Sequence, residues 1–162
     1  MEKLVYLSLG SNLGNSEKQL RDAIQGLASL GQVTKVSSFY ETEPVGQLPQ
    51  PWFTNCALEM KTQKMPRQLL AAVLKLEETM GRRRTQEKGP RTVDIDILLF
   101  GNSIVHAPGL CIPHPAMHQR RFVLEPLAEI APGLCHPQLK QTIRELRDAL
   151  PSGQLVRKLP PA

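Results

Sequence analysis

Aromatic residues are scarce in this chain, and its cysteines are few and far apart. Phenylalanine, tryptophan and tyrosine make up 4% of the 162 residues, which argues against a surface that stacks many nucleic-acid bases. The three cysteines are Cys56, Cys111 and Cys135, and no two of them have CxxC spacing. We therefore expect reduced thiols, and neither a disulfide framework nor a structural zinc site.

Long apolar runs are also missing. No stretch approaches the roughly 18 residues that indicate a membrane helix. The N-terminus, MEKLVYLSLG, enters a strand-like pattern directly, without the charged region, apolar stretch and cleavage site of a signal peptide. We therefore expect a cytoplasmic protein with no membrane partner.

The common phosphate-loop motifs are absent too. The turn GSNLG, residues 10–14, follows a predicted strand and precedes a predicted helix, which is where such a loop would lie. It matches neither GxxxxGK(S/T) nor GxGxxG. We interpret it as mainly a structural turn, so that any phosphate must be held elsewhere.

What the chain does have is a local concentration of positive charge. The length suits one domain over residues 1–162. The formal net charge is +5, which favours polyanionic ligands without choosing among them. Five of the twenty basic residues lie within ten positions: Arg82, Arg83, Arg84, Lys88 and Arg91.

Hydrophobic periodicity predicts an α+β fold. We expect strands over residues 3–9, 32–40, 53–61 and 92–100, and a short strand over 103–105 that pairs back. Helices are expected from a Ser16–Gln19 capping box to about residue 30, from Pro66 to Gly81, and over 121–130 and 142–150. The order is that of a ferredoxin-like fold, with helices on a mostly antiparallel sheet in three αβα layers. The tail is expected to pack poorly at its end.

Two aspartates interrupt the most apolar strand, in GPRTVDIDILLFG. Asp94 and Asp96 are two residues apart, so they share one face of the strand. Like charges this close need a divalent cation between them, nearby arginines, or an exposed edge strand. The ILLF that follows favours a central strand. A carboxylate pair suits Mg²⁺ bound together with substrate phosphates.

The basic stretch 82–91 comes directly before this strand. On charge alone its arginines are counter-ions or a solvated patch. Beside a magnesium site they suit phosphate, which the planar guanidinium binds in bidentate fashion. Gly81 and Gly89-Pro90 frame the stretch, which would let it fold over a ligand.

Two histidines lie four residues apart, at His114 and His118. HxxxH on a helix can bind zinc, but Pro113 and Pro115 place the first histidine in a turn. A hydrogen bond from His114 to a phosphate, with Arg120 alongside, is the better interpretation.

Several segments together resemble the 6-hydroxymethyl-7,8-dihydropterin pyrophosphokinase family of the folate pathway. They are YLSLGSNLG, SSFYETEP, FTN, GPRTVDIDILLFG and HPAMHQRRFVLEPLAEIAP, in this order from residue 4 to about residue 137. The resemblance implies an enzyme that transfers the pyrophosphoryl unit of ATP to the hydroxymethyl group of the pterin and releases AMP. It also implies a monomer with small-molecule substrates and no nucleic-acid partner.

The resemblance implies roles for particular residues. Asp94 and Asp96 would hold two Mg²⁺ ions, and Arg82 and Arg91 would stabilise the transferred group. Positions associated with ATP are Glu77, Arg84, Arg91, Leu98, His114 and Arg120. Positions lining the pterin pocket are Thr42, Glu43, Val45, Phe53, Asn55 and Phe122. The chain departs from the family at Glu87 and Lys88, where a basic residue and a tryptophan are usual.

The residue types and spacing of Phe53 and Asn55 are consistent with the pterin pocket that the resemblance implies. Phe53 and Asn55 are two residues apart and share a strand face, and a flat heterocycle with a polar edge needs aromatic faces and directed hydrogen bonds. Phe53 and Phe122 would equally suit an ordinary core.

Two other classes of function remain open from the residues alone. A metal-dependent hydrolase would use Asp94, Asp96, His114 and His118, and would need no pterin. A basic nucleic-acid-binding module would bind oligonucleotides in a salt-sensitive manner.

Overall fold

An antiparallel sheet forms the centre of the protein. The computed structural model describes residues 2–12, 14–44, 51–81 and 93–160. The strands of the main sheet are β1 (Lys3–Ser11), β2 (Gln32–Val36), β3 (Tyr40–Thr42), β4 (Phe53–Thr62), β5 (Asp94–Phe100) and β8 (Val156–Lys158). They lie in the order β5-β1-β4-β3-β8, and β2 pairs with the far half of β4. Every pairing among these described strands is antiparallel, as the sequence predicted.

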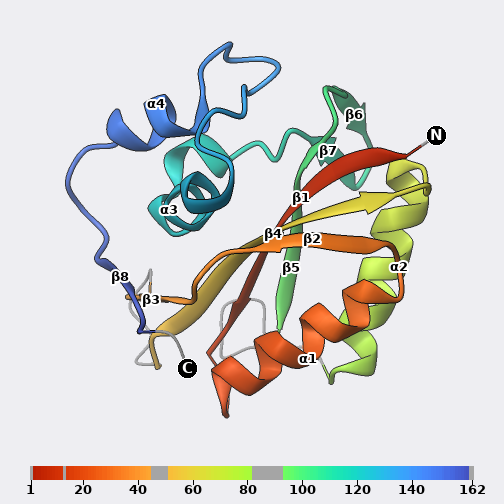
Figure 1. Ribbon diagram of the computed structural model, residues 1–162, viewed down its shortest axis with the longest axis horizontal. Coiled ribbons are helices and arrows are strands. Elements are labelled where there is room, and N and C mark those ends of the chain that lie inside the picture. The colour runs from red at the N-terminus through yellow and green to blue at the C-terminus, as the bar shows by residue number, and fades with distance from the viewer. Residues whose placement is uncertain (1, 13, 45–50, 82–92, 161–162) are drawn as a thin grey trace.

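Helices cover both faces of this sheet. They are α1 (Ser16–Ala28), α2 (Pro66–Thr79), the short 3-10 turn η1 (Met117–Gln119), α3 (Arg121–Ile130) and α4 (Ile143–Asp148). Figure 1 shows α1 and α2 on one side of the sheet and α3 with α4 on the other. The predicted α+β fold in three αβα layers is confirmed. Among the described residues, no helix has the length and apolar character needed to cross a membrane.

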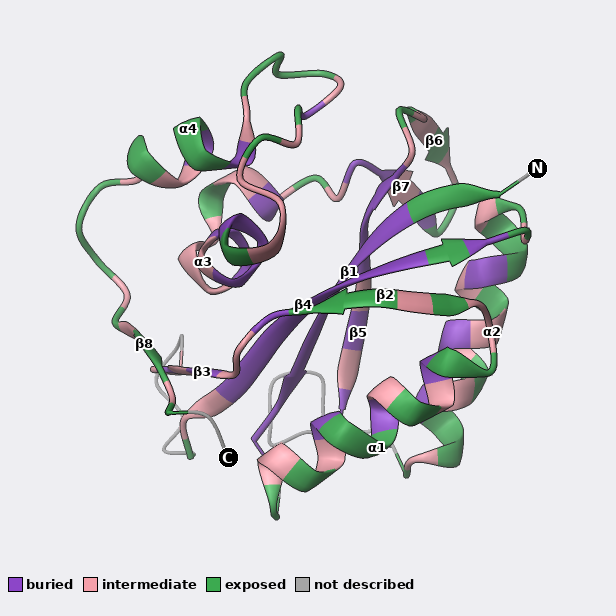
Figure 2. Cartoon of the chain, viewed as in Figure 1, coloured by how far each residue is buried: buried purple, intermediate pink, exposed green. Residues whose placement is uncertain are grey.

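Two hydrophobic clusters fix the two faces. Alternate residues of β1, among them Leu7 and Leu9, are buried against α1 and α2. Tyr6 joins Leu124 and Leu127 of α3 in the other cluster. Side chains alternate along a strand, so β1 and β4, which are covered on both faces, are buried over most of their length (Figure 2). Buried polar residues in these strands are therefore candidates for a functional site.

The strand that carries the two aspartates is an edge strand. In the described part of the sheet β5 pairs with β1 alone, so the expectation of a central strand is wrong. Its apolar residues are explained by helices above and below rather than by strands on both sides. Groups outside the sheet form hydrogen bonds with the outer edge of β5. The Ile95 N–H donates to Glu77 at 2.7 Å, and the Leu98 carbonyl accepts the His114 N–H at 3.0 Å.

The predicted strand over 32–40 is two strands, β2 and β3. Ser37 separates them, because its hydroxyl accepts the Ala57 N–H at 2.8 Å in place of a backbone carbonyl. Ser38 then donates its N–H to Glu129 of α3 at 2.9 Å. These side-chain hydrogen bonds interrupt the ladder, which periodicity alone does not reveal.

Other element boundaries also differ from the expectation. Asn15, not Ser16, caps α1, since its side chain accepts the Lys18 N–H. The short strand expected over 103–105 is β6 (Val105–Ala107), and it pairs with β7 (Leu110–Ile112) in a separate hairpin. The tail adds β8 to the sheet at the edge of β3. Its last residues, 161–162, where poor packing was expected, lie outside the described residues.

Candidate active site

The aspartate pair faces the α3 side of the sheet. Asp94 and Asp96 are partly buried, whereas Ile95 and Ile97 are buried in the cluster beneath α1 and α2. The predicted alternation is therefore confirmed. Two carboxylates on one face of an edge strand form a donor set that suits a hard divalent cation.

A single row of residues connects the aspartates to the predicted pterin pocket. Asp94 lies opposite Gly10 of β1, Gly10 lies opposite Asn55 of β4, and Asn55 lies opposite Tyr40 of β3. Residues opposite one another in neighbouring strands point to the same face. Asp94 and Asn55 are two strands apart, which corresponds to about 10 Å. The row thus places a carboxylate and an amide on one face of the sheet.

Gly10 is what allows Asn55 its place in this row. A Cβ at Gly10 would lie 2.6 Å from Asn55 Nδ2, closer than van der Waals contact permits. The amide therefore occupies the space that a side chain on β1 would fill. The sequence suggested that Gly10 belongs to a structural turn; it lies in β1 instead. A glycine inside a strand pattern is the signal that could have revealed this close approach.

Among the described residues, two buried polar atoms in this region have no hydrogen-bond partner. They are Asn55 Oδ1 and Thr42 Oγ1. Thr42 lies opposite Phe53, which is two residues from Asn55 on β4. A buried polar atom without a hydrogen bond lowers the free energy of unfolding by about 1–3 kcal/mol, so such atoms are rare and often lie at functional sites. A ligand with polar groups along one edge would satisfy both atoms.

Aromatic rings accompany these polar atoms. Phe53 is partly buried at the start of β4 and shares the face of Asn55. Phe122 is partly buried in the first turn of α3, packed against the cluster on the same side of the sheet. The Arg120 guanidinium lies over the Phe122 ring, 5.6 Å from its centroid. This is a cation–π contact that orients the arginine.

His114 lies within the electrostatic reach of both Arg120 and Asp94. Burial lowers the pKa of His114, Arg120 lowers it further, and Asp94 opposes the shift. The ring is therefore neutral at pH 7. Its Nδ1 accepts the Ala116 N–H at 3.2 Å, which leaves the proton on Nε2. His114 is thus a neutral hydrogen-bond donor beside the carboxylates.

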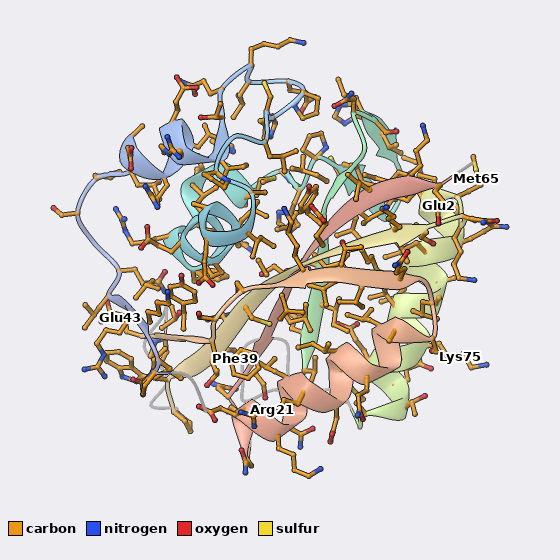
Figure 3. All side chains as sticks on the ribbon, in the orientation of Figure 1. Glu2, Arg21, Phe39, Glu43, Met65 and Lys75 are labelled. Atoms are coloured by element: carbon orange, nitrogen blue, oxygen red, sulfur yellow. The ribbon has the colours of Figure 1, made fainter. Side chains whose placement is uncertain are left out.

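Three other predicted residues already have contacts with the protein itself. Glu77 is buried and accepts the Ile95 N–H, and the Leu98 carbonyl accepts the His114 N–H. The Glu43 carboxylate accepts the Leu155 N–H at 2.8 Å, and Figure 3 shows Glu43 beside the C-terminal segment. The ligand roles of these three residues stay predictions. The predicted site residues Val45, Arg82, Arg84 and Arg91 lie outside the described residues, as do Glu87 and Lys88.

Sequence reasoning did not single out Tyr40 or Glu129. The Tyr40 hydroxyl donates to Glu129 at 2.6 Å, which ties the row on the sheet to α3. Burial and this hydrogen bond raise the pKa of Tyr40, so the phenol keeps its proton. Their separation of 89 residues leaves no local sequence signal for the pair.

The zinc alternative concerns His114 and His118. Within the described ranges, no three His, Cys, Asp or Glu side chains are grouped as metal ligands would be. His118 lies in η1 and lowers the pKa of His136, for which burial is the larger cause. A pair of aspartates completed by substrate phosphates needs no third protein ligand.

Comparison with known proteins identifies the family of this chain. The family model described as "7,8-dihydro-6-hydroxymethylpterin-pyrophosphokinase (HPPK)" matches residues 6–132. The 2-amino-4-hydroxy-6-hydroxymethyldihydropteridine pyrophosphokinase of Bacillus subtilis is 47% identical over 132 residues, covering 80% of this chain and 79% of that protein. The folic acid synthesis protein fol1 of Schizosaccharomyces pombe is 40% identical over 152 residues.

Solved structures share the fold. A Plasmodium falciparum HPPK-DHPS structure aligns with a TM-score of 0.75 at 17% identity, covering 91% of this chain and 45% of that one. The match to the S. pombe protein includes 93% of this chain but only 21% of that protein. The family model covers most of the chain. This chain therefore belongs to the 7,8-dihydro-6-hydroxymethylpterin-pyrophosphokinase family.

Proposed function

We propose that this chain transfers pyrophosphate from ATP to 6-hydroxymethyl-7,8-dihydropterin, giving the pterin diphosphate and AMP, in folate biosynthesis. Family membership supports the reaction. The observation that carries the assignment to this surface is the pair of unsatisfied atoms, Asn55 Oδ1 and Thr42 Oγ1, on the face of the aspartates. We further propose that the catalyst is one domain over residues 1–162, acts as a monomer and works in the cytoplasm.

The pterin side follows from the polar atoms and the rings. Asn55 and Thr42 have buried polar atoms on the α3 face of the sheet, and the polar edge of the pterin would satisfy them. Phe53 and Phe122 supply aromatic faces for the flat ring. A site built to hydrogen-bond its ligand rejects analogues that lack the matching groups, because its own polar atoms are then left unpaired.

The phosphate side follows from charge. Asp94 and Asp96 fit Mg²⁺ and would hold two ions, which when bound neutralise the phosphate charge and orient the acceptor hydroxyl. His114 donates from Nε2 to a phosphate oxygen as a neutral group, so it binds ATP without adding charge. Arg120, steered by the Phe122 ring, adds a cation. Five further residues are included in the ATP side on the resemblance alone: Glu77, Leu98, Arg82, Arg84 and Arg91.

The chemical step is one displacement at phosphorus. The oxygen of the pterin hydroxymethyl group forms a bond to the β-phosphorus of ATP and loses its proton. The bond from that phosphorus to the α,β-bridging oxygen breaks, and AMP leaves with the electron pair. Binding the two substrates in line on one face accounts for much of the rate enhancement, because the entropy cost of bringing two molecules together has then been met by binding.

The test is to identify the nucleotide product. The protein is incubated with ATP, Mg²⁺ and 6-hydroxymethyl-7,8-dihydropterin, and the nucleotides are separated. We expect AMP only when the pterin and Mg²⁺ are both present. ADP, or hydrolysis of ATP that proceeds without pterin, would contradict the proposal and favour a hydrolase.

A further inference from the structure

The C-terminal segment holds the strand that carries Thr42. β8 pairs with β3, with Arg157 opposite Glu41 and Val156 opposite Thr42. The Glu43 N–H donates to the Leu155 carbonyl at 3.2 Å, and the Glu43 carboxylate accepts the Leu155 N–H at 2.8 Å. The matched family region ends at residue 132, so this segment lies beyond it.

Arg157 contacts two residues that are distant in sequence. Its guanidinium donates to Glu41 Oε2 at 2.9 Å. The same group lies over the Trp52 ring, 5.0 Å from its centroid. Glu41 comes before residues 45–50 and Trp52 comes after them, so one side chain joins the two stems of this connection.

The stems bear directly on the pterin side. Thr42 follows Glu41, Phe53 follows Trp52, and Thr42 and Phe53 lie opposite each other in the sheet. Adjacent residues of a strand point to opposite faces, so Glu41 points away from the face of Thr42. Arg157 therefore contacts the two stems from the face opposite to that of Thr42 and Phe53.

We propose that Arg157 is a positioning residue for the pterin pocket: by joining Glu41 to Trp52 it fixes the spacing of Thr42 and Phe53. This inference rests on the proposed function. It concerns acceptor binding alone, because the carboxylate pair and His114 lie on other elements of the fold.

The contact is suited to local positioning rather than to overall stability. The side chains of Arg157 and Glu41 are 59% and 35% exposed. Exposed ion pairs contribute little to folding because water and salt screen them. Removing Arg157 should therefore disturb the stems while the rest of the protein stays folded.

The experiment compares Arg157→Ala and Arg157→Lys with a matched control. Arg21→Ala removes another arginine that contacts a carboxylate, Glu17 at 3.5 Å, and a ring, Phe39 at 5.5 Å. We expect Arg157→Ala to raise the KM for pterin about three- to tenfold, with the KM for ATP within about twofold. Arg157→Lys should fall between it and the wild type, because lysine keeps the charge and loses the planar stack. Arg21→Ala should match the wild type.

Trp52 provides a readout that does not depend on turnover. It is the only tryptophan in the sequence, so intrinsic fluorescence reports on this stem alone. Loss of the guanidinium stack in Arg157→Ala should change its emission and its quenching by acrylamide, whereas Arg21→Ala should change neither.

The outcomes separate the two proposals. An active wild type whose pterin KM is unaffected by Arg157→Ala would overturn the positioning role and leave the proposed function intact. A change of equal size in both KM values would also overturn it, since that indicates general damage. A wild type that makes no AMP would refute the proposed function and, with it, the role of Arg157 in pterin binding.

Discussion

Gly10 and Asn55 face each other across β1 and β4, and the Asn55 amide fills the space that a side chain at Gly10 would need. This relationship connects the two halves of the site, because Gly10 also lies opposite Asp94 on its other side. We therefore expect a substitution of Gly10 to act on the proposed pterin pocket through Asn55, although residue 10 has no side chain.

Gly10→Ala should displace the Asn55 amide. We expect the pterin KM to rise about tenfold and the free energy of unfolding to fall by about 1–3 kcal/mol, because the added methyl group overpacks the strand pair. Steady-state kinetics and denaturant titration measure the two effects. Gly133→Ala is the control, since a Cβ there meets no atom within 4 Å. Equal effects of the two substitutions would rule out the steric argument.

Thr42→Val should separate stability from binding. The hydroxyl is buried without a partner, so replacing it with a methyl group of similar size should raise the free energy of unfolding by about 1 kcal/mol. The pterin KM should increase about two- to tenfold, the value of one hydrogen bond. The control is Thr54→Val. Thr54 follows Phe53 in β4 and points to the opposite face of the sheet, so this substitution should leave the pterin KM unchanged. A Thr42→Val variant with normal pterin KM would remove Thr42 from the pocket.

Asp94→Asn and Asp96→Asn should each abolish most of the activity without unfolding the protein. Loss of a proposed Mg²⁺ ligand would remove several kcal/mol of transition-state stabilisation, so we expect AMP formation to fall about 10³-fold or more. Asp22→Asn, on the surface of α1, should retain full activity. Circular dichroism checks the fold. Near-normal turnover of Asp96→Asn at saturating Mg²⁺ would argue against the two-ion arrangement.

Stability should decrease as the pH falls below about 6.5, because the buried His136 and the partly buried His114 are held neutral. His136 Nδ1 accepts the N–H groups of Gln138 and Leu139, and burial followed by His118 lowers its pKa from 6.5. His114 is shifted in the same direction. The unfolded chain then binds more protons than the folded one, so stability is complete above pH 6.5 and is lost as the pH falls toward the lowered pKa values.

His136→Asn tests this origin of the pH dependence. The asparagine Oδ1 can replace Nδ1 as the acceptor of the two N–H groups, but it does not titrate in this range. Between pH 7.5 and 5 the variant should lose less stability than the wild type in denaturant titrations. Identical pH profiles for the two proteins would assign the loss to other groups.

The layers and the carboxylate face could be predicted because they depend on local periodicity. A spacing of two residues places Asp94 and Asp96 on one face of a strand wherever that strand lies in the sheet. The edge position of β5 could not be predicted, because an apolar strand between two layers of helices has the same composition as a central one. The break at Ser37 likewise depends on Ala57 and Glu129, which lie far away in sequence.

By itself, the sequence determined the order of the main elements, the shared face of the aspartates and, through its motifs, the family. Tertiary structure alone decided that Asp94, Gly10 and Asn55 form one row, that Thr42 and Asn55 keep unsatisfied atoms, and that Arg157 joins Glu41 to Trp52. The physical reason is one of range. Side-chain direction follows from a residue's neighbours in the chain, whereas strand register and hydrogen-bond satisfaction depend on partners that only folding brings together.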